Sequence, residues 1–187
     1  MSTTTATPTA ATATWQVDPA HSSIEFAVRH LMISTVRGRF GAVSGTVRGL
    51  EGRGTGPELE VSIDAASIDT RQAQRDEHLR SADFFDVANF PAITFRGSRI
   101  HGPVTGAFTL AGNLTMKGIT REVMLDVESQ GQGPDPWGNL RAGFSATGKL
   151  DRRDFGLTWN QLLEAGGITV GDEIKFTVDV ELIRQAV

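Results

Sequence analysis

The chain has 187 residues, enough for one domain of ordinary size and a short tail. Its 18 Lys and Arg against 22 Asp and Glu give a net charge of −4, which argues against a protein that tracks a nucleic-acid backbone and gives no electrostatic reason to dock on an anionic membrane. The absence of cysteine excludes disulfides and thiolate chemistry, and the 21 glycines indicate many turns and therefore many strands.

The first fourteen residues differ in composition from the rest of the chain. They contain seven threonines, no charged side chain, no basic region and no apolar core of a secretory signal. We therefore expect residues 1–14 to be a disordered tail on a cytoplasmic protein and residues 15–187 to form one domain. The alternative is a chain from which a signal has been removed. No apolar run is long enough to predict a spanning helix.

From residue 15 onward, apolar and polar side chains alternate with a period of two, which is typical of strands. Ile24, Phe26 and Val28 share one face of the first such stretch. The predicted strands are residues 23–29, 35–50, 59–64, 93–96, 107–110, 123–127 and 174–182. Few connections could hold a crossover helix, so the pattern predicts an all-β antiparallel sheet closed into a barrel, or a sandwich.

Turn residues and one helical stretch separate the strands. Gly38, Gly41 and Gly45 are expected bend or bulge sites, and residues 52–57 and 131–139 are expected loops. Residues 72–81 predict a short helix that Asp69-Thr70 would cap, and residues 160–165 give a weaker helical signal.

Known catalytic signatures are missing: the sequence has no phosphate loop, no dinucleotide fingerprint, no His-Glu-x-x-His and no nucleophile elbow. The histidines are His21, His30, His78 and His101, and their spacing matches no metal motif. We expect His21 and His30 to form hydrogen bonds at strand ends, and we expect no metal and no cofactor.

Charged residues cluster on the expected helix. Asp76, Glu77 and His78 lie beside Arg75 and Arg80. They could be an acid/base group or could contact a polar headgroup. For catalysis a solvated helix face with local ion pairs is the better interpretation, whereas for headgroup contact the two are evenly matched.

Two further segments combine aromatic residues with charges. Asp83-Phe84-Phe85-Asp86 holds two adjacent aromatics, which we expect to anchor the helix to the barrel; if exposed, they could instead form a homodimer contact. Arg152-Arg153 precedes the apolar Phe155-Gly156-Leu157, and such a basic pair can receive a phosphate or carboxylate, although it is more often solvated. A small barrel must fill its lumen or enclose a ligand, and composition alone favours the filled core.

Ordered sequence blocks resemble the YceI-like family of lipocalin-like polyisoprenoid-binding proteins. The blocks are Asp18-x-x-His21-Ser22-x-Ile24-x-Phe26-x-Val28-x-His30-Leu31, Val36-Arg37-Gly38-Arg39-Phe40, Ser67-Ile68-Asp69-Thr70, Arg75-Asp76-x-His78-Leu79, Asp83-Phe84-Phe85-Asp86 through Phe90-Pro91, Gly112-Asn113-Leu114-Thr115-Met116-Lys117-Gly118-Ile119-Thr120, Arg153-Asp154-Phe155-Gly156 and Val170-Gly171-Asp172. The resemblance covers about residues 15–184. It implies an eight-stranded antiparallel barrel with a helix between strands, and an apolar tunnel for a polyisoprenoid or another long amphiphile, without catalysis.

The leading hypothesis is therefore a barrel that binds a polyisoprenoid, an isoprenoid quinone or a fatty acyl compound for transport, storage or sequestration. The residues expected to line its lumen are Ile24, Phe26, Val28, Phe40, Val61, Ile63, Ile93, Phe95, Phe108, Leu110, Leu125, Phe144, Phe176 and Val178. The residues expected near the headgroup are His21, Arg37, Asp76, His78 and Arg153. The alternatives are a ligand-free barrel that acts as a stress-related or partner-binding scaffold, and an enzyme that uses Asp76 and His78 as acid and base.

Overall fold

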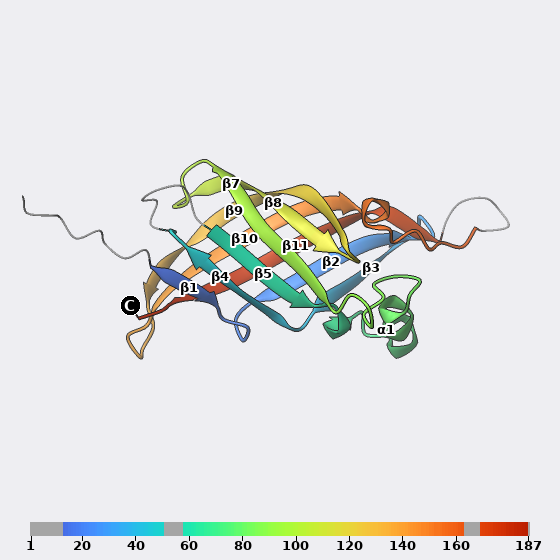
Figure 1. Cartoon of the computed structure of the whole chain (residues 1–187), viewed down its shortest axis with the longest axis horizontal. Coiled ribbons are helices and arrows are strands. Elements are labelled where there is room, and N and C mark those ends of the chain that lie inside the picture. The colour runs from blue at the N-terminus through green and yellow to red at the C-terminus, as the bar shows by residue number, and fades with distance from the viewer. Residues whose placement is uncertain (1–12, 51–57, 163–168, 187) are drawn as a thin grey trace, which may run out of the picture.

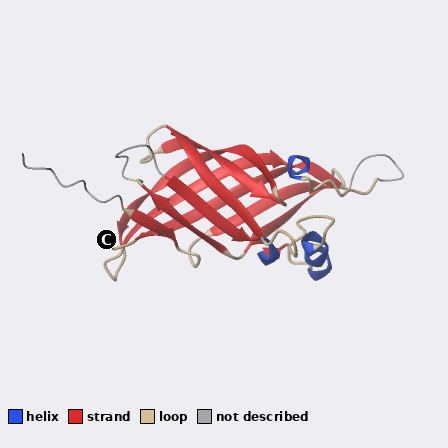
Figure 2. Ribbon diagram, viewed as in Figure 1, coloured by secondary structure: helices blue, strands red, loops and turns tan. Residues whose placement is uncertain are grey.

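The fold is a long barrel of antiparallel strands with its helices gathered at one end (Figures 1 and 2). The computed structural model describes residues 13–50, 58–162 and 169–186. The strands are β1 Thr14–Val17, β2 Ser23–His30, β3 Ser34–Phe40, β4 Val43–Arg48, β5 Glu58–Asp64, β6 Ile68–Asp69, β7 Ala92–His101, β8 Ala107–Met116, β9 Ile119–Pro134, β10 Leu140–Asp151 and β11 Val170–Arg184. The helices are α1 Ala73–Arg80 and the short 3-10 turns η1 Ala65–Ser67 and η2 Arg152–Phe155.

The barrel is closed by the pairing of β1 with β11. Going around the wall, the order is β1, β4, β5, β7, β8, β9, β10 and β11, and every pairing is antiparallel. The remaining strands continue the sheet from β11. Strand β2 pairs with the part of β11 that β1 leaves free, β3 pairs with β2, and β6 pairs with β3. The expected eight-stranded antiparallel barrel is thus confirmed, and the sandwich is not formed.

The strands expected from alternation all form, but the short strands β1 and β6 and the long strand β10 were missed. The inward side chains of β10 include Ala142 and Ala146, which are buried, and its sequence also contains Gly143 and Gly148. Small side chains weaken the contrast between apolar and polar positions, so the sequence of this wall strand lacks the alternation that predicts a strand. The expected loop at 131–139 is shorter than predicted, because β9 continues to Pro134 and pairs with β10 across a bulge at Gly143.

The helix at the barrel end forms as expected, with a different cap. Gln72 is the N-cap of α1, and its side chain accepts a hydrogen bond from the backbone N–H of Arg75. Asp69 instead accepts from the backbone N–H of Arg71, which has a positive φ of 62° and turns the chain from β6 toward α1. The second helical signal is wrong at residues 160–161, and 163–165 lie outside the described residues.

The described part of the chain begins just before the first strand. Strand β1 begins at Thr14, and Ala13 before it is buried. The tail up to residue 12 and the loop at 52–57 lie outside the described residues. Within the described ranges, no helix has the length and apolar character needed to cross a membrane.

Candidate functional site

The barrel encloses an apolar cavity of about 290 Å³. All fourteen apolar residues predicted to line the lumen do line it. They come from β2, β3, β5, β7, β8, β9, β10 and β11, so the alternation of each strand places one apolar row inside. The polar lining residues are Ser22, Arg152 and Asp179, and every other lining residue is apolar.

The cavity is long rather than wide. Its lining residues on β11 run from Val170 to Leu182, twelve residues apart along one strand. At about 3.3 Å per residue and a strand tilt of about 40°, this corresponds to roughly 30 Å along the barrel axis. A narrow apolar space of this length suits an extended chain better than a compact molecule.

Three phenylalanines on the lumen wall lie over glycines of neighbouring strands. The ring of Phe26 covers Gly38, that of Phe95 covers Gly112, and that of Phe176 covers Gly148. A Cβ added at Gly148 would come within 2.5 Å of Cζ of Phe176. Each ring therefore occupies wall space that a side chain on the neighbouring strand would take, which leaves the middle of the lumen free.

Sequence reasoning missed these glycine–phenylalanine contacts. The prediction assigned Gly38 to a bend, but it lies inside β3 directly opposite Phe26 of β2. The chain bends at Gly41, between β3 and β4, as predicted, whereas Gly45, like Gly38, lies inside a strand. The pairing register is what brings glycine and phenylalanine together, and register cannot be read from a single strand.

At the α1 end the lumen continues into a wider opening of about 640 Å³. The two spaces share Phe26, Val28, Leu79, Phe84 and Val170, so they adjoin each other. The other residues that line this opening, here called the mouth, are mostly polar. They are Arg29, His30, Val36, Thr70, Gln72, Gln74, Arg75, His78, Trp159 and Thr169. Most of the surface that the lining residues expose in the mouth is apolar, so the mouth offers an amphiphile an apolar wall with a few polar groups.

Aromatic rings lie where the lumen meets the mouth. The ring centroid of Phe84 lies 5.1 Å from that of His78 and 5.3 Å from that of Trp159. Phe85 packs edge-on against Phe40 at 5.8 Å. Phe84 is buried and Phe85 is half-buried, so these residues anchor the helix segment as predicted. The alternative of an exposed homodimer contact at Phe84-Phe85 is wrong, and Trp159 gave no signal in the sequence.

The expected acid/base pair is not brought together. Asp76 is buried and accepts hydrogen bonds from the backbone N–H and the hydroxyl of Thr70, at 2.9 and 2.5 Å. Nε2 of His78 lies 2.9 Å from a carboxylate oxygen of Asp83. Thr70 also accepts from Nε of Arg75 at 2.7 Å, which completes a network that holds α1 against the barrel.

Of the five residues expected near a headgroup, His78 lines the mouth and the other four line neither described cavity. Arg37 is exposed on β3, and Arg153 is exposed and paired with Asp151 at 2.7 Å. Asp76 is committed to Thr70. His21 precedes β2 and forms its hydrogen bond with Asp18, as expected for a strand end.

Arg152 is a buried charge at the edge of the lumen. Its guanidinium donates to the backbone oxygens of Leu157, Trp159 and Gly171, and to a carboxylate oxygen of Asp172 at 3.2 Å. Burial lowers the pKa of Arg152 below its ordinary value. These bonds tie the segment after η2 to β11, so Arg152 holds Trp159 at the mouth instead of receiving a phosphate or carboxylate.

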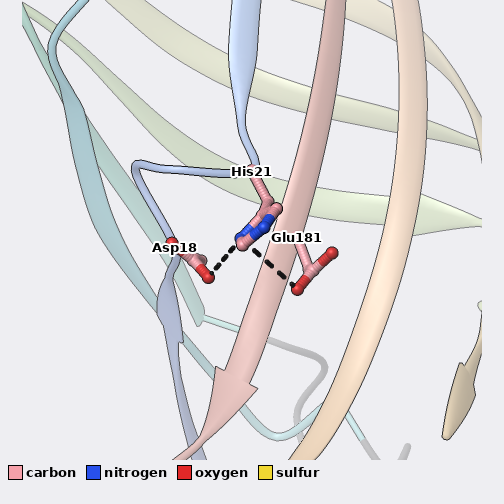
Figure 3. A group of neighbouring side chains, drawn as sticks. All are labelled: Asp18, His21 and Glu181. Atoms are coloured by element: carbon pink, nitrogen blue, oxygen red, sulfur yellow. Dashed lines mark hydrogen bonds and ion pairs between the residues drawn. The ribbon is translucent and has the colours of Figure 1, made fainter. Parts of the chain in front are cut away.

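A second polar cluster lies near the start of β2. Asp18, His21 and Glu181 lie within 4.8 Å of one another, a geometry that could hold a cation (Figure 3). However, Nη1 of Arg141 donates to both Asp18 and Glu181, and its Nε donates to Asp135 at 2.8 Å. Because Arg141 already supplies the positive charge, this cluster joins the start of β2 to β10 and β11.

The same cluster predicts how stability depends on pH. Hydrogen bonds from His21 and then Arg141 lower the pKa of Asp18 from 3.8 to about 2, and Arg141 holds the pKa of Asp135 well below its usual range. Their stabilisation is complete above pH 3.8 and is lost as the pH falls toward 2, because the unfolded chain binds protons first. We expect the free energy of unfolding to fall across that window.

Urea unfolding followed by tryptophan fluorescence would measure this loss at a series of pH values. In the variant Arg141→Gln the two carboxyl pKa values lie closer to normal, so the loss should be smaller and should end at a higher pH, while it still begins near the unfolded-state pKa. Arg99→Gln, at an exposed ion pair with Glu122, is the control and should keep the wild-type profile. Identical profiles for wild type and Arg141→Gln would contradict the assignment.

Comparisons with known proteins agree with this geometry. The chain matches the family model of the YceI-like domain over residues 15–182. It is 35% identical over 181 residues to the protein YceI of Salmonella newport, covering 96% of this chain and 91% of that protein. It is 37% identical over 165 residues to a UPF0312 protein of Pectobacterium atrosepticum, covering 88% and 82%.

Solved structures show the same fold. The YceI protein of Campylobacter jejuni superposes with a TM-score of 0.70 at 29% identity, covering 84% of this chain and 90% of that chain. Burkholderia cenocepacia BcnA gives 0.75 at 21% identity, covering 88% and 98%. A polyisoprenoid-binding domain from Saccharophagus degradans gives 0.66 at 14% identity, covering 91% and 98%. At these identities, the last two establish the fold alone.

Proposed function

We propose, from the premise that this chain belongs to the YceI-like family, that its barrel binds the hydrocarbon chain of a long amphiphile without chemical change. The single observation that carries the proposal is the apolar lumen, which adjoins the mouth and its few polar groups beside α1. The chain lies along the lumen, and the headgroup lies among the polar residues near α1. The arrangement favours a binding barrel over a ligand-free scaffold, because the phenylalanine rings lie along the wall and leave the lumen open.

The energetics of such binding need no strong polar contact. Each methylene moved from water into an apolar site contributes about 0.8 kcal/mol. Ten methylenes therefore contribute roughly 8 kcal/mol, which corresponds to a micromolar dissociation constant before the cost of ordering the chain is subtracted, and a longer chain can offset that cost. The ligand class is set by length and apolar character, and the headgroup only orients it.

Within this class we propose a polyisoprenoid, an isoprenoid quinone or a fatty acyl compound. The related barrel from Saccharophagus degradans is a polyisoprenoid-binding domain, which supports the first of these. Transport, storage or sequestration each follow from binding. Three further expectations stay predictions from the sequence: a cytoplasmic location, no binding of nucleic acid, and a homodimer. The homodimer would need a contact other than Phe84-Phe85.

A chain-length series tests the proposal. Primary alcohols of increasing length would compete with a fluorescent fatty acid for the purified protein. We expect the inhibition constant to fall about fourfold per added methylene, the fold-change that corresponds to about 0.8 kcal/mol, until the lumen is full. An affinity that does not change with length, or no displacement at any length, would reject the lumen as the binding site.

A further inference from the structure

Exposed apolar side chains gather around the mouth. Five large hydrophobic side chains are exposed within the described residues, and three of them, Met32, Ile33 and Leu162, are at the α1 end of the barrel. They are 58%, 80% and 83% exposed. Of the other two, Met124 lies along β9 and Trp137 lies in the β9–β10 hairpin at the opposite end (Figure 1).

The turn that carries Met32 and Ile33 is held in an unfavourable conformation. Leu31 and Met32 have φ values of 51° and 59°, a region that residues other than glycine rarely adopt. Nη2 of Arg29 donates to the carbonyl of Met32 at 2.6 Å, and the backbone N–H of Ile33 donates to that of His30 at 3.2 Å. Backbone strain of this kind persists where neighbouring contacts enforce it, and it often marks function.

This turn is tied to the segment that carries Leu162. The backbone N–H of Leu31 donates to the carbonyl of Thr169 at 2.9 Å, and the N–H of Thr169 donates to the carbonyl of Gln161 at 3.1 Å. Thr169 also lines the mouth. These hydrogen bonds place the turn with Met32 and Ile33 beside the segment that leads to Leu162, and the side chains of Met32, Ile33 and Leu162 are here called the apolar tip.

We propose that the apolar tip inserts into the surface of a lipid bilayer and holds the mouth against it, so that the ligand passes between bilayer and lumen. Insertion rests on the exposed tip itself, and only the passage of the ligand rests on the proposed function. Burial of exposed aliphatic side chains drives membrane association at an interface. The mouth, which adjoins the lumen, then faces the medium in which a long amphiphile dissolves.

Two observations favour a bilayer over a protein as the occupant. A stable protein interface buries about 1,600 Å² in total, and three side chains in two turns are too few to supply one side of it. The strained turn of the apolar tip also exposes Met32 and Ile33 to solvent, so these side chains project from the surface and do not line a groove. The net charge is −4, so attachment by insertion is expected to depend little on salt.

Flotation with vesicles of pure phosphatidylcholine tests the proposal. We expect the wild-type protein to float with the vesicles at both low and high salt. The double variant Met32→Ser, Ile33→Ser should bind about tenfold or more weakly, because two exposed aliphatic side chains are lost. The control Trp137→Ser removes a larger exposed side chain at the opposite end and should float as the wild type does.

Two further measurements separate this proposal from the lumen. Without vesicles, the double variant should displace a fluorescent fatty acid as the wild type does, since both substituted residues lie outside the lumen. Flotation that is equal in wild type and double variant, or absent in the wild type, would contradict insertion of the apolar tip even if ligand binding is normal. A wild-type protein that sediments as a dimer and a double variant that sediments as a monomer would also contradict it, because a second copy of the chain would then cover the apolar tip.

Discussion

Replacing Gly148 with valine is expected to abolish uptake of long-chain ligands while the barrel stays folded. A Cβ at this position lies 2.5 Å from the ring of Phe176 and 3.1 Å from Cδ2 of Leu125, and both contacts are side-chain atoms. The ring can therefore move, and the open direction is into the lumen. In a cavity of about 290 Å³, a displaced phenyl ring blocks the path of an extended chain.

A rescue variant separates this blockage from misfolding. Phe176→Ala in the Gly148→Val background removes the displaced ring and should restore uptake. Gly143→Ala on the same strand is the matched control, since its Cβ would meet only the side chain of Gln130 at 3.3 Å. Ligand uptake by the three variants would be measured by fluorescence displacement, with thermal unfolding as the test of folding. Normal uptake in folded Gly148→Val would show that the ring does not bound the ligand path.

A charge on the lumen wall is expected to have the second large effect. In Phe26→Glu a carboxylate replaces a ring that lines both the lumen and the mouth. A hydrocarbon chain bound beside it would strip water from the charge, so we expect the affinity for a long-chain alcohol to fall more than about a hundredfold. Because Phe26 is half-buried, the new carboxylate can reach the mouth in the free protein and the barrel should persist.

The matched control lies one residue along the same strand. Ala27→Glu places a carboxylate on the opposite side of β2, where Arg37 and Lys175 are its register partners. It should bind ligand as the wild type does. Isothermal titration of both variants with one alcohol measures the difference. Equal affinities in Phe26→Glu and Ala27→Glu would show that Phe26 does not contact the bound ligand.

The sequence was most informative where a strand has one face inside the barrel. Alternation alone places Ile24, Phe26 and Val28 on one side of β2, and the lumen is built on that side. The same reasoning accounts for the lining residues on the other predicted strands, because a period of two leaves only two choices for each strand. It failed at β10, where Ala142 and Ala146 are too small to mark the inner face.

Features that depend on two segments were out of reach of the sequence. Gly148 and Phe176 become neighbours only through the register of β10 with β11. Trp159 joins the mouth because Arg152 binds its carbonyl oxygen. The expected headgroup residues were mostly misplaced for the same reason: their motifs are structural, as the hydrogen bond of His21 with Asp18 illustrates.

Native mass spectrometry of the purified protein, with organic extraction of whatever it releases, is the most direct test that the lumen holds a long amphiphile. The account predicts one lipid-sized adduct for each chain, released by solvent and absent from Gly148→Val. A bare mass that stays bare after incubation with polyisoprenoids, isoprenoid quinones and fatty acids would contradict it and would favour a barrel that acts without a ligand.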